Sequence, residues 1–306
     1  MTAPQKVVAA TRRSILCLAP PGLVLLASLT SPLAAFANTS SKLAHVPAEI
    51  DPSLTPDSMT YDAKDERLRR AGRLIQEALN APTIEDEERT WTQIIDEFSD
   101  VDAVWRDDVV GRAYGNRGNC RSRQGKVDAA LRDYDESIRV CPWSVDPVLN
   151  RGVLFENQLM FEEAIQDYRA VLKVNPSDPV AWNNLGNALM GSQQFESAIK
   201  AFDKAVKLGG NNYAFAMANK SICLYAKGED EEAEREMMSL LRRFPNFAEI
   251  RASLGSLQWM KGEREKAEEN WLRVNEPMYR DVEWLRKSRR WPERLAAAAE
   301  AYLNLT

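Results

Sequence analysis

The most constraining feature of the sequence is a unit of 34 residues that occurs five times in succession, with one extra residue before the fourth copy. Two positions of the unit hold only small residues: one is always alanine, and the position twelve residues earlier is glycine or serine. Small side chains at fixed positions allow two antiparallel helices to cross closely. The copies are 111–144, 145–178, 179–212, 214–247 and 248–281. A period of this length predicts a solenoid, in which each unit buries its apolar face against its neighbours.

A large side chain stands four residues after each of these alanines, and we expect it to wedge into the next helix pair. Glycine recurs where the first helix of a pair must stop, and proline recurs where the second must end. The alanines are Ala130, Ala164, Ala198, Ala233 and Ala267, the earlier small residues are Gly118, Gly152, Gly186, Ser221 and Gly255, and the large residues are Tyr134, Tyr168, Phe202, Met237 and Trp271. The pattern predicts five helix pairs with one continuous core.

This pattern resembles the tetratricopeptide repeat (TPR) over residues 111–281. The third copy carries the family's spacing most fully, with Trp182, Leu185, Gly186, Ala198 and Phe202. The resemblance implies an all-α, right-handed superhelical solenoid of five TPR helix pairs whose first helices line the concave side. The fourth copy departs from the pattern, since it starts one residue late and has Ser221 at the small position. An extra loop residue would explain this, as would a local change of superhelical pitch at a binding site.

The ends of a solenoid need covers, because a terminal unit lacks a neighbour on one side. Residues 62–110 are expected to supply an extra N-terminal helix pair over 62–80 and 83–99. Residues 282–306 are expected to form a C-terminal cap with a helix over 293–303. Trp284 and Trp291 are expected to pack in this cap.

Residues 1–37 have the order of a cleavable export signal: the basic pair Arg12 and Arg13, an apolar stretch, and a small-residue cleavage region that ends at Ala37. The pair resembles a twin-arginine signal; an ordinary basic n-region and an uncleaved anchor are the alternatives. Residues 38–61 are expected to be a flexible tether, because they are rich in Ser, Pro, Thr and Asp and lack helical periodicity. The tether contains His45, the only histidine.

Charge and residue chemistry argue against several classes of function. Removal of the leader leaves 37 basic against 45 acidic residues, a formal charge of −8, which argues against nucleic acid binding. The sequence has no zinc-ligand spacing, phosphate-cradling glycine loop or activated nucleophile motif. We therefore predict no enzyme activity, no metal and no cofactor. The acidic run Glu85, Asp86, Glu87 and Glu88 could serve an enzyme site formed with a partner, but the charged first turn of a helix explains it more simply.

Asparagine stands two residues before the small position in four of the five copies. On the concave side, these residues would form a ladder of amide donors and acceptors that could hold the main chain of an extended peptide. Alternatively, they satisfy neighbouring helix ends. The predicted peptide-binding residues are Asn116, Asn119, Asn150, Asn183, Asn184, Asn187 and Asn219, with Tyr225 and Trp259 as either pocket or core residues.

Four basic residues near the C-terminus form the densest basic cluster outside the leader: Arg286, Lys287, Arg289 and Arg290. This cluster is either a solvated face of the cap or a docking patch for an acidic partner or an anionic membrane surface. Cys120, Cys141 and Cys223 are expected to be buried free thiols, although the sequence does not fix their redox state.

The leader and the terminal segment together resemble TPR proteins of cyanobacteria and of the chloroplast thylakoid lumen. This resemblance implies a non-catalytic scaffold for a protein partner that aids assembly or maintenance of a thylakoid protein complex, with no membrane span after processing. Peripheral membrane contact is a further option. The alternatives are a TPR adaptor of the bacterial periplasm, a non-catalytic subunit of an enzyme complex, and a purely structural spacer. The sequence does not identify the partner, the oligomeric state or the organism.

Overall fold

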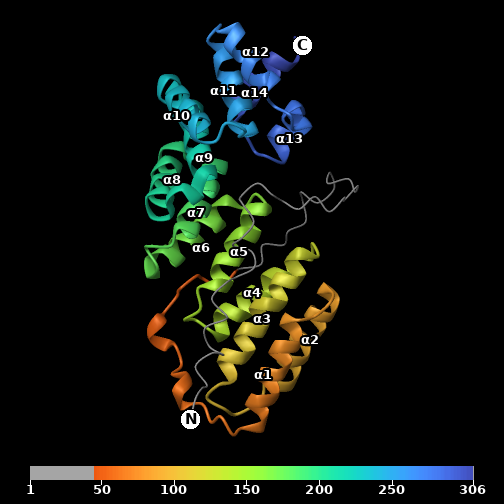
Figure 1. Cartoon of the computed structure of the whole chain (residues 1–306). Coiled ribbons are helices and arrows are strands. Elements are labelled where there is room, and N and C mark those ends of the chain that lie inside the picture. The colour runs from red at the N-terminus through yellow and green to blue at the C-terminus, as the bar shows by residue number, and fades with distance from the viewer. Residues whose placement is uncertain (1–44, 306) are drawn as a thin grey trace, which may run out of the picture. The chain divides into compact units, whose positions relative to one another are not determined.

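The computed structural model describes residues 45–305, in which a non-α-helical stretch up to residue 65 is followed by α-helices joined by short turns (Figure 1). These residues belong to two compact units, 45–176 and 177–305. The predicted leader and the first part of the predicted tether lie outside the described residues. Between residues 45 and 305 there is no strand, and every helix is too short or too polar to cross a membrane.

Unit 45–176 contains three consecutive helix pairs. The first is the expected extra pair, and the other two contain the first two copies of the repeat, although α3 begins at Arg106, before the predicted start of the first copy at residue 111. The first helix starts four residues later than the sequence predicts, because Asp65 caps it by accepting a hydrogen bond from the Arg67 amide at 2.9 Å. The elements are η3 (Pro52–Leu54), η4 (Ser58–Thr60), α1 (Glu66–Leu79), α2 (Ile84–Phe98), α3 (Arg106–Arg123), α4 (Val127–Val140), α5 (Asp146–Asn157) and α6 (Phe161–Val174).

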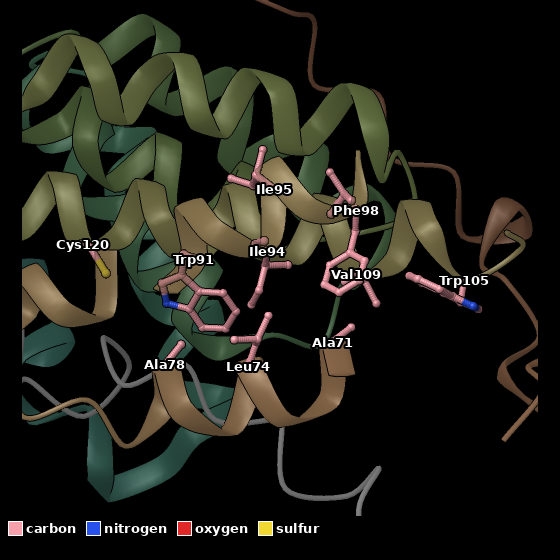
Figure 2. Close-up of a cluster of buried hydrophobic side chains, with 12 residues drawn as sticks. Ala71, Leu74, Ala78, Trp91, Ile94, Ile95, Phe98, Trp105, Val109 and Cys120 are labelled. Carbon is pink, nitrogen blue, oxygen red and sulfur yellow. The ribbon is translucent and has the colours of Figure 1, made fainter. Parts of the chain in front are cut away.

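The core of the extra pair lies where α1, α2 and α3 meet. Trp91 and Ile94 of α2 lie against Leu74 and Ala78 of α1, and all four side chains are buried (Figure 2). Burying each large apolar side chain contributes about 1.5–3 kcal/mol. The predicted helix pair is therefore present, with Leu79 as the exception among the apolar residues at helical spacing, since it is 46% exposed.

The described part of the predicted tether differs from a flexible linker. The backbone amide of Asp51 donates to the carbonyl of Pro142 at 2.9 Å, and the Val46 carbonyl accepts from Arg151 Nη1 at 2.9 Å. His45 Nδ1 lies 3.1 Å from Asp135 Oδ2, and its ring meets the edge of Phe155 with centroids 4.8 Å apart. Residues 45–51, the N-terminal segment, are thus docked on α4 and α5. These partners are 90 or more residues away in the sequence, which is why local composition did not reveal them.

Unit 177–305 contains a helix pair in each of the last three copies, followed by a C-terminal segment that we define as residues 281–303. In this segment, α14 packs on α11 and α9, and Leu285, Trp291 and Leu295 are buried. The elements are α7 (Pro179–Gly191), α8 (Phe195–Gly209), η5 (Gly210–Tyr213), α9 (Ala214–Lys227), α10 (Asp230–Arg243), α11 (Ala248–Met260), α12 (Arg264–Leu272), η6 (Pro277–Arg280), α13 (Val282–Lys287) and α14 (Glu293–Leu303).

The small and large positions of the repeat contact each other within one helix pair. A Cβ atom on Gly152 would lie 2.7 Å from the Tyr168 ring, and one on Gly186 would lie 2.5 Å from the Phe202 ring. Real Cβ atoms do not come this close, so glycine is required beneath the ring. The structure therefore adds a contact that the sequence did not predict, between the ring and the glycine of its own pair; the predicted wedge into the next pair stays a prediction.

Candidate functional site

The predicted ladder residues lie on the first helix of each pair, and within each unit two of them are bonded to each other. In unit 45–176, Asn150 Nδ2 of α5 donates to Asn119 Oδ1 of α3 at 3.0 Å. In unit 177–305, Asn219 Nδ2 of α9 donates to Asn187 Oδ1 of α7 at 2.9 Å. We call these the first and second asparagine pairs. Each links two consecutive copies of the repeat.

The first asparagine pair keeps hydrogen-bonding capacity. Asn119 Oδ1 also accepts from the Tyr134 hydroxyl at 2.9 Å, which fills both lone pairs of that oxygen. Among residues 45–305, Asn119 Nδ2 and Asn150 Oδ1 make no further hydrogen bond. A donor and an acceptor therefore remain on two amides held together by a direct bond. Among residues 45–305, neither amide bonds to a backbone group at a helix end. The alternative, that the asparagines satisfy neighbouring helix ends, therefore does not apply to Asn119 and Asn150.

The second asparagine pair contacts the C-terminal segment. Asn219 Oδ1 accepts from Arg289 Nη2 at 2.7 Å, and Arg289 Nε lies 2.5 Å from Glu249 Oε1. Trp291 Nε1 donates to the same oxygen at 3.0 Å. The Glu249 side chain is fully buried, and burial alone would lower the pKa of Arg289; the neighbouring carboxylate outweighs this and raises it. The Asn219 amide therefore binds an arginine of its own chain.

Tyr225 and Trp259 also contact the C-terminal segment. The Arg294 guanidinium lies 4.1 Å from the centroid of the Tyr225 ring and donates to the Tyr225 carbonyl. It also forms a two-bond ion pair with Asp230, with Nη2 at 2.8 Å from Oδ2. Trp259 meets the edge of Tyr302 with ring centroids 5.3 Å apart. Both predicted pocket residues therefore lie under the chain's own segment.

The remaining ladder residues take other positions. Asn116 Nδ2 donates to the Arg112 carbonyl of its own helix at 2.9 Å. Asn183 is buried, and its Nδ2 lies 3.4 Å from Oδ1 of the half-buried Asn184. Asn183 Oδ1 has no partner among the described residues. These three residues do not join either asparagine pair.

The basic cluster near the C-terminus is divided by its ion pairs. Arg286 binds Glu300 at 2.7 Å and Glu293 at 2.9 Å, and Lys287 binds Glu283 at 2.6 Å, all within the C-terminal segment. Arg289 points inward, with 12% of its side chain exposed. Arg290 has a left-handed backbone, with φ of 58°. Arg289 therefore does not belong to an exposed patch, and a docking role for the other three residues stays a prediction.

Sequence reasoning missed a set of charged pairs that join the two helices of a repeat. Arg117 Nη2 lies 2.8 Å from Asp133 Oδ1, and Arg151 Nη2 lies 2.7 Å from Asp167 Oδ1. The same positions in the fourth copy hold Lys220 and Glu236, 3.4 Å apart. The signal was present in the sequence, because each cation immediately precedes the small position and each acid immediately precedes the large one.

The acidic run in α2 serves structural contacts. Thr83 caps the helix by accepting from the Asp86 amide at 3.1 Å, and Asp86 in turn accepts from the Thr83 hydroxyl at 2.8 Å. Glu88 accepts from Arg121 at 2.8 Å and from Lys126 at 2.9 Å. Asp86 and Glu88 of this run are thus engaged in contacts within the chain.

The three cysteines outside the leader are buried and free. Burial raises the pKa of Cys120 and of Cys141 to about 12, and it also raises the pKa of Cys223. Thiols with a raised pKa are poor nucleophiles and poor metal ligands. Within residues 45–305, no cluster of three or more His, Cys, Asp or Glu side chains is arranged to hold a metal.

Comparison with known proteins supports the repeated helix pairs of the fold. The profile of the family described as tetratricopeptide repeat matches residues 149–213 and 184–239. A peroxisomal targeting signal receptor from Candida glabrata is 34% identical over 93 residues, which is 28% of this chain and only 16% of that receptor. The chain therefore spans a small part of the length of this relative.

Solved structures show the same fold. A tetratricopeptide repeat protein from Parabacteroides merdae is 17% identical with a TM-score of 0.60, covering 77% of this chain and 93% of its own. YrrB, described as a TPR protein with an unusual peptide-binding site, is 20% identical with a TM-score of 0.50, covering 69% and 97%. Residues 149–239 thus carry tetratricopeptide repeats, and the helix pairs in each unit have a TPR-like fold.

Proposed function

We propose that the chain is a non-catalytic scaffold that binds an extended segment of a partner protein along α3 and α5, at the first asparagine pair. The observation that carries this proposal is the donor of Asn119 and the acceptor of Asn150, which make no further bond among residues 45–305. One donor and one acceptor together match the carbonyl and amide of an extended main chain, whatever its side chains. The peptide-binding site named for YrrB and the targeting-signal receptor named among the relatives support such a role.

We further propose that the scaffold works after export, most simply in the thylakoid lumen, where it would aid assembly or maintenance of a protein complex. This part rests on the order of charged, apolar and small residues in 1–37 and on the resemblance to lumen proteins. A periplasmic adaptor or a non-catalytic enzyme subunit would use the same site. Sequencing the N-terminus of the protein purified from its source tests the export step, since cleavage after Ala37 predicts Asn38 as the first residue.

The binding test compares partner capture by residues 38–306 with capture by a variant in which Asn119 and Asn150 are both alanine. Loss of one net hydrogen bond costs about 1 kcal/mol, so two lost contacts weaken binding roughly ten-fold or more. Asn275→Ala, on the exposed turn before η6, is the matched control. A partner retained by the double variant at full strength, with its helix content unchanged by circular dichroism, would remove the first asparagine pair from the proposal.

A further inference from the structure

The C-terminal segment lies on α9 and α11, the two first helices of the last two copies of the repeat. Its contacts are specific as well as apolar. Arg289 reaches Asn219 and Glu249, and Arg294 reaches Asp230 and the backbone of Tyr225. Three of the residues that sequence analysis assigned to a bound peptide, Asn219, Tyr225 and Trp259, are thus held by a segment of the same chain.

The chemistry of this face selects arginine. Glu249 is 1% exposed, so its carboxylate requires a cationic partner with strong hydrogen bonds. Asp230 binds Arg294 through both carboxylate oxygens, a geometry that the guanidinium provides and an ammonium does not. The Tyr225 ring beneath the same guanidinium adds a cation–π contact. Glu249 of α11, Asp230 at the start of α10 and the Tyr225 ring of α9 therefore recognise two arginines five residues apart.

The resident segment satisfies this face only in part. Glu249 Oε2 has no hydrogen-bond partner among residues 45–305, because Arg289 and Trp291 both use Oε1. Ser253 Oγ, one turn further along α11, is also buried without a partner. An unpaired buried polar group is destabilising. A segment whose arginine bound both oxygens of Glu249 would fit better than the resident one.

We infer that residues 281–303 are a resident ligand that can leave the α9–α11 face, and that the partner of this face is a protein segment with two similarly spaced arginines and an apolar helical side. The inference rests on the proposed function, since it extends protein binding to the second asparagine pair and makes it competitive. The left-handed backbone of Arg290, in a residue other than glycine, is consistent with a segment that binds with some strain.

The first test uses the intact mature chain and hydrogen exchange resolved by helix. If the segment opens without unfolding the repeats, amides of α14 exchange at least ten-fold faster than those of α11. Glu249→Gln should increase exchange in α14 further and leave α3 and α5 unchanged. Equal exchange in α14 and α11 would mean that the segment opens only with the repeats, and would overturn the inference.

The second test measures exchange with a free segment. A protease site is inserted between Asn275 and Glu276, which are exposed, and the cut chain is mixed with a fluorescent synthetic peptide of residues 281–305. We expect the peptide to replace the cut segment, and a peptide carrying Arg289→Gln and Arg294→Gln to bind at least ten-fold more weakly. The matched control peptide carries Arg286→Gln and Lys287→Gln, which removes the same charge from residues paired within the segment.

Each other result contradicts the inference. Equal binding of the two substituted peptides would exclude arginine recognition. Loss of exchange protection in α9 and α11 upon cutting would show that the segment is a structural cap. Failure of the proposed function has a different signature, because it is measured at Asn119 and Asn150 in the other unit, which the cut leaves unchanged.

Discussion

The two units each hold a flanking segment of the chain through an arginine, but with the donor and acceptor roles reversed. In unit 45–176 the arginine belongs to the repeats: Arg151 donates to the Val46 carbonyl, and the N-terminal segment adds His45 beside Asp135. In unit 177–305 the arginines belong to the C-terminal segment and the carboxylates, Glu249 and Asp230, belong to the repeats. The repeat register fixes the asparagine pair in both units. The flanking segment makes the difference: the C-terminal segment donates Arg289 to Asn219 Oδ1, whereas the N-terminal segment donates nothing to Asn150 Oδ1.

The largest expected effect is the loss of the arginine in unit 45–176. Arg151→Ala leaves Asp167 buried without a counter-ion and frees Asp135 and the N-terminal segment, so we expect a loss of about 3–5 kcal/mol in unfolding free energy. Lysine at this position should restore little, because it cannot make the two-bond contact with Asp167. Chemical denaturation measures the loss.

The matched control for this prediction is Lys220→Ala in unit 177–305. Its side chain is 21% exposed and its acids are partly solvated, so the expected loss is about 1 kcal/mol or less. Equal losses for the two variants would show that the buried pair in α5–α6 contributes no more than the half-exposed pair in α9–α10.

Acid should weaken the contact between α2 and the first repeat through Glu88. Burial alone would raise its pKa, but hydrogen bonds from Arg121, Lys126 and Gln124 outweigh burial and lower the pKa from 4.5 to about 2. Because the folded pKa is lower than the unfolded one, ionised Glu88 stabilises the fold above about pH 4.5, and this contribution disappears as the pH falls toward 2.

A pH series of thermal unfolding tests this prediction, with Glu88→Gln as the comparison. The substituted chain should be less stable at pH 7 and should lose less stability between pH 4.5 and 2. In unit 177–305, Glu234 has a similar environment, with Lys261 at 2.6 Å and Gln258 at 3.2 Å, and a lowered pKa. Identical pH profiles for wild type and Glu88→Gln would exclude the Glu88 carboxylate as the source of the stability lost in acid.

The asparagine pairs give a smaller but more direct comparison. Asn150→Ala removes one amide–amide bond and should cost about 1 kcal/mol, whereas Asn219→Ala also removes the bond from Arg289 and should cost about 2–3 kcal/mol. Hydrogen exchange should show faster exchange in α14 for Asn219→Ala and no change in that helix for Asn150→Ala. Equal losses of unfolding free energy in the two variants would mean that the hydrogen bond from Arg289 to Asn219 contributes little to stability.

The helix pairs and the positions of the asparagines were predictable because they follow from a period that the sequence repeats five times. The contacts of the flanking segments were not, since Arg289 and Asn219 are 70 residues apart and nothing periodic connects them. The alternatives for Tyr225 and Trp259 illustrate the limit. Sequence spacing placed both on the first helices, but whether a partner or the chain's own segment covers them depends on the path of the C-terminal segment.

The charged pairs between helices were missed for a different reason. Arg117 and Arg151 occupy equivalent positions, and so do Asp133 and Asp167, so the register already placed them on facing helices. Sequence reasoning followed the apolar, small and asparagine positions and did not consider the charged ones, which are usually exposed. Here burial is possible because the two charges neutralise each other.

The smallest expected effect concerns the turn between the two helices of a pair, where each of the five copies has a residue with positive φ. Three copies have glycine there, but Leu159 in unit 45–176 and Gln193 in unit 177–305 each have φ of 62°. The left-handed conformation costs a residue other than glycine roughly 1–2 kcal/mol, and glycine loses about 0.4–1 kcal/mol through the greater freedom of the unfolded chain. Both side chains are exposed, so little packing is lost on substitution.

Leu159→Gly and Gln193→Gly should therefore each stabilise the chain by about 0.5–1 kcal/mol, measured by chemical denaturation. Because the two sites are equivalent in the repeat and lie in different units, equal gains would show that the turn acts locally, whereas a loss at only one site would identify a unit in which the original side chain makes a contact worth more than the backbone strain.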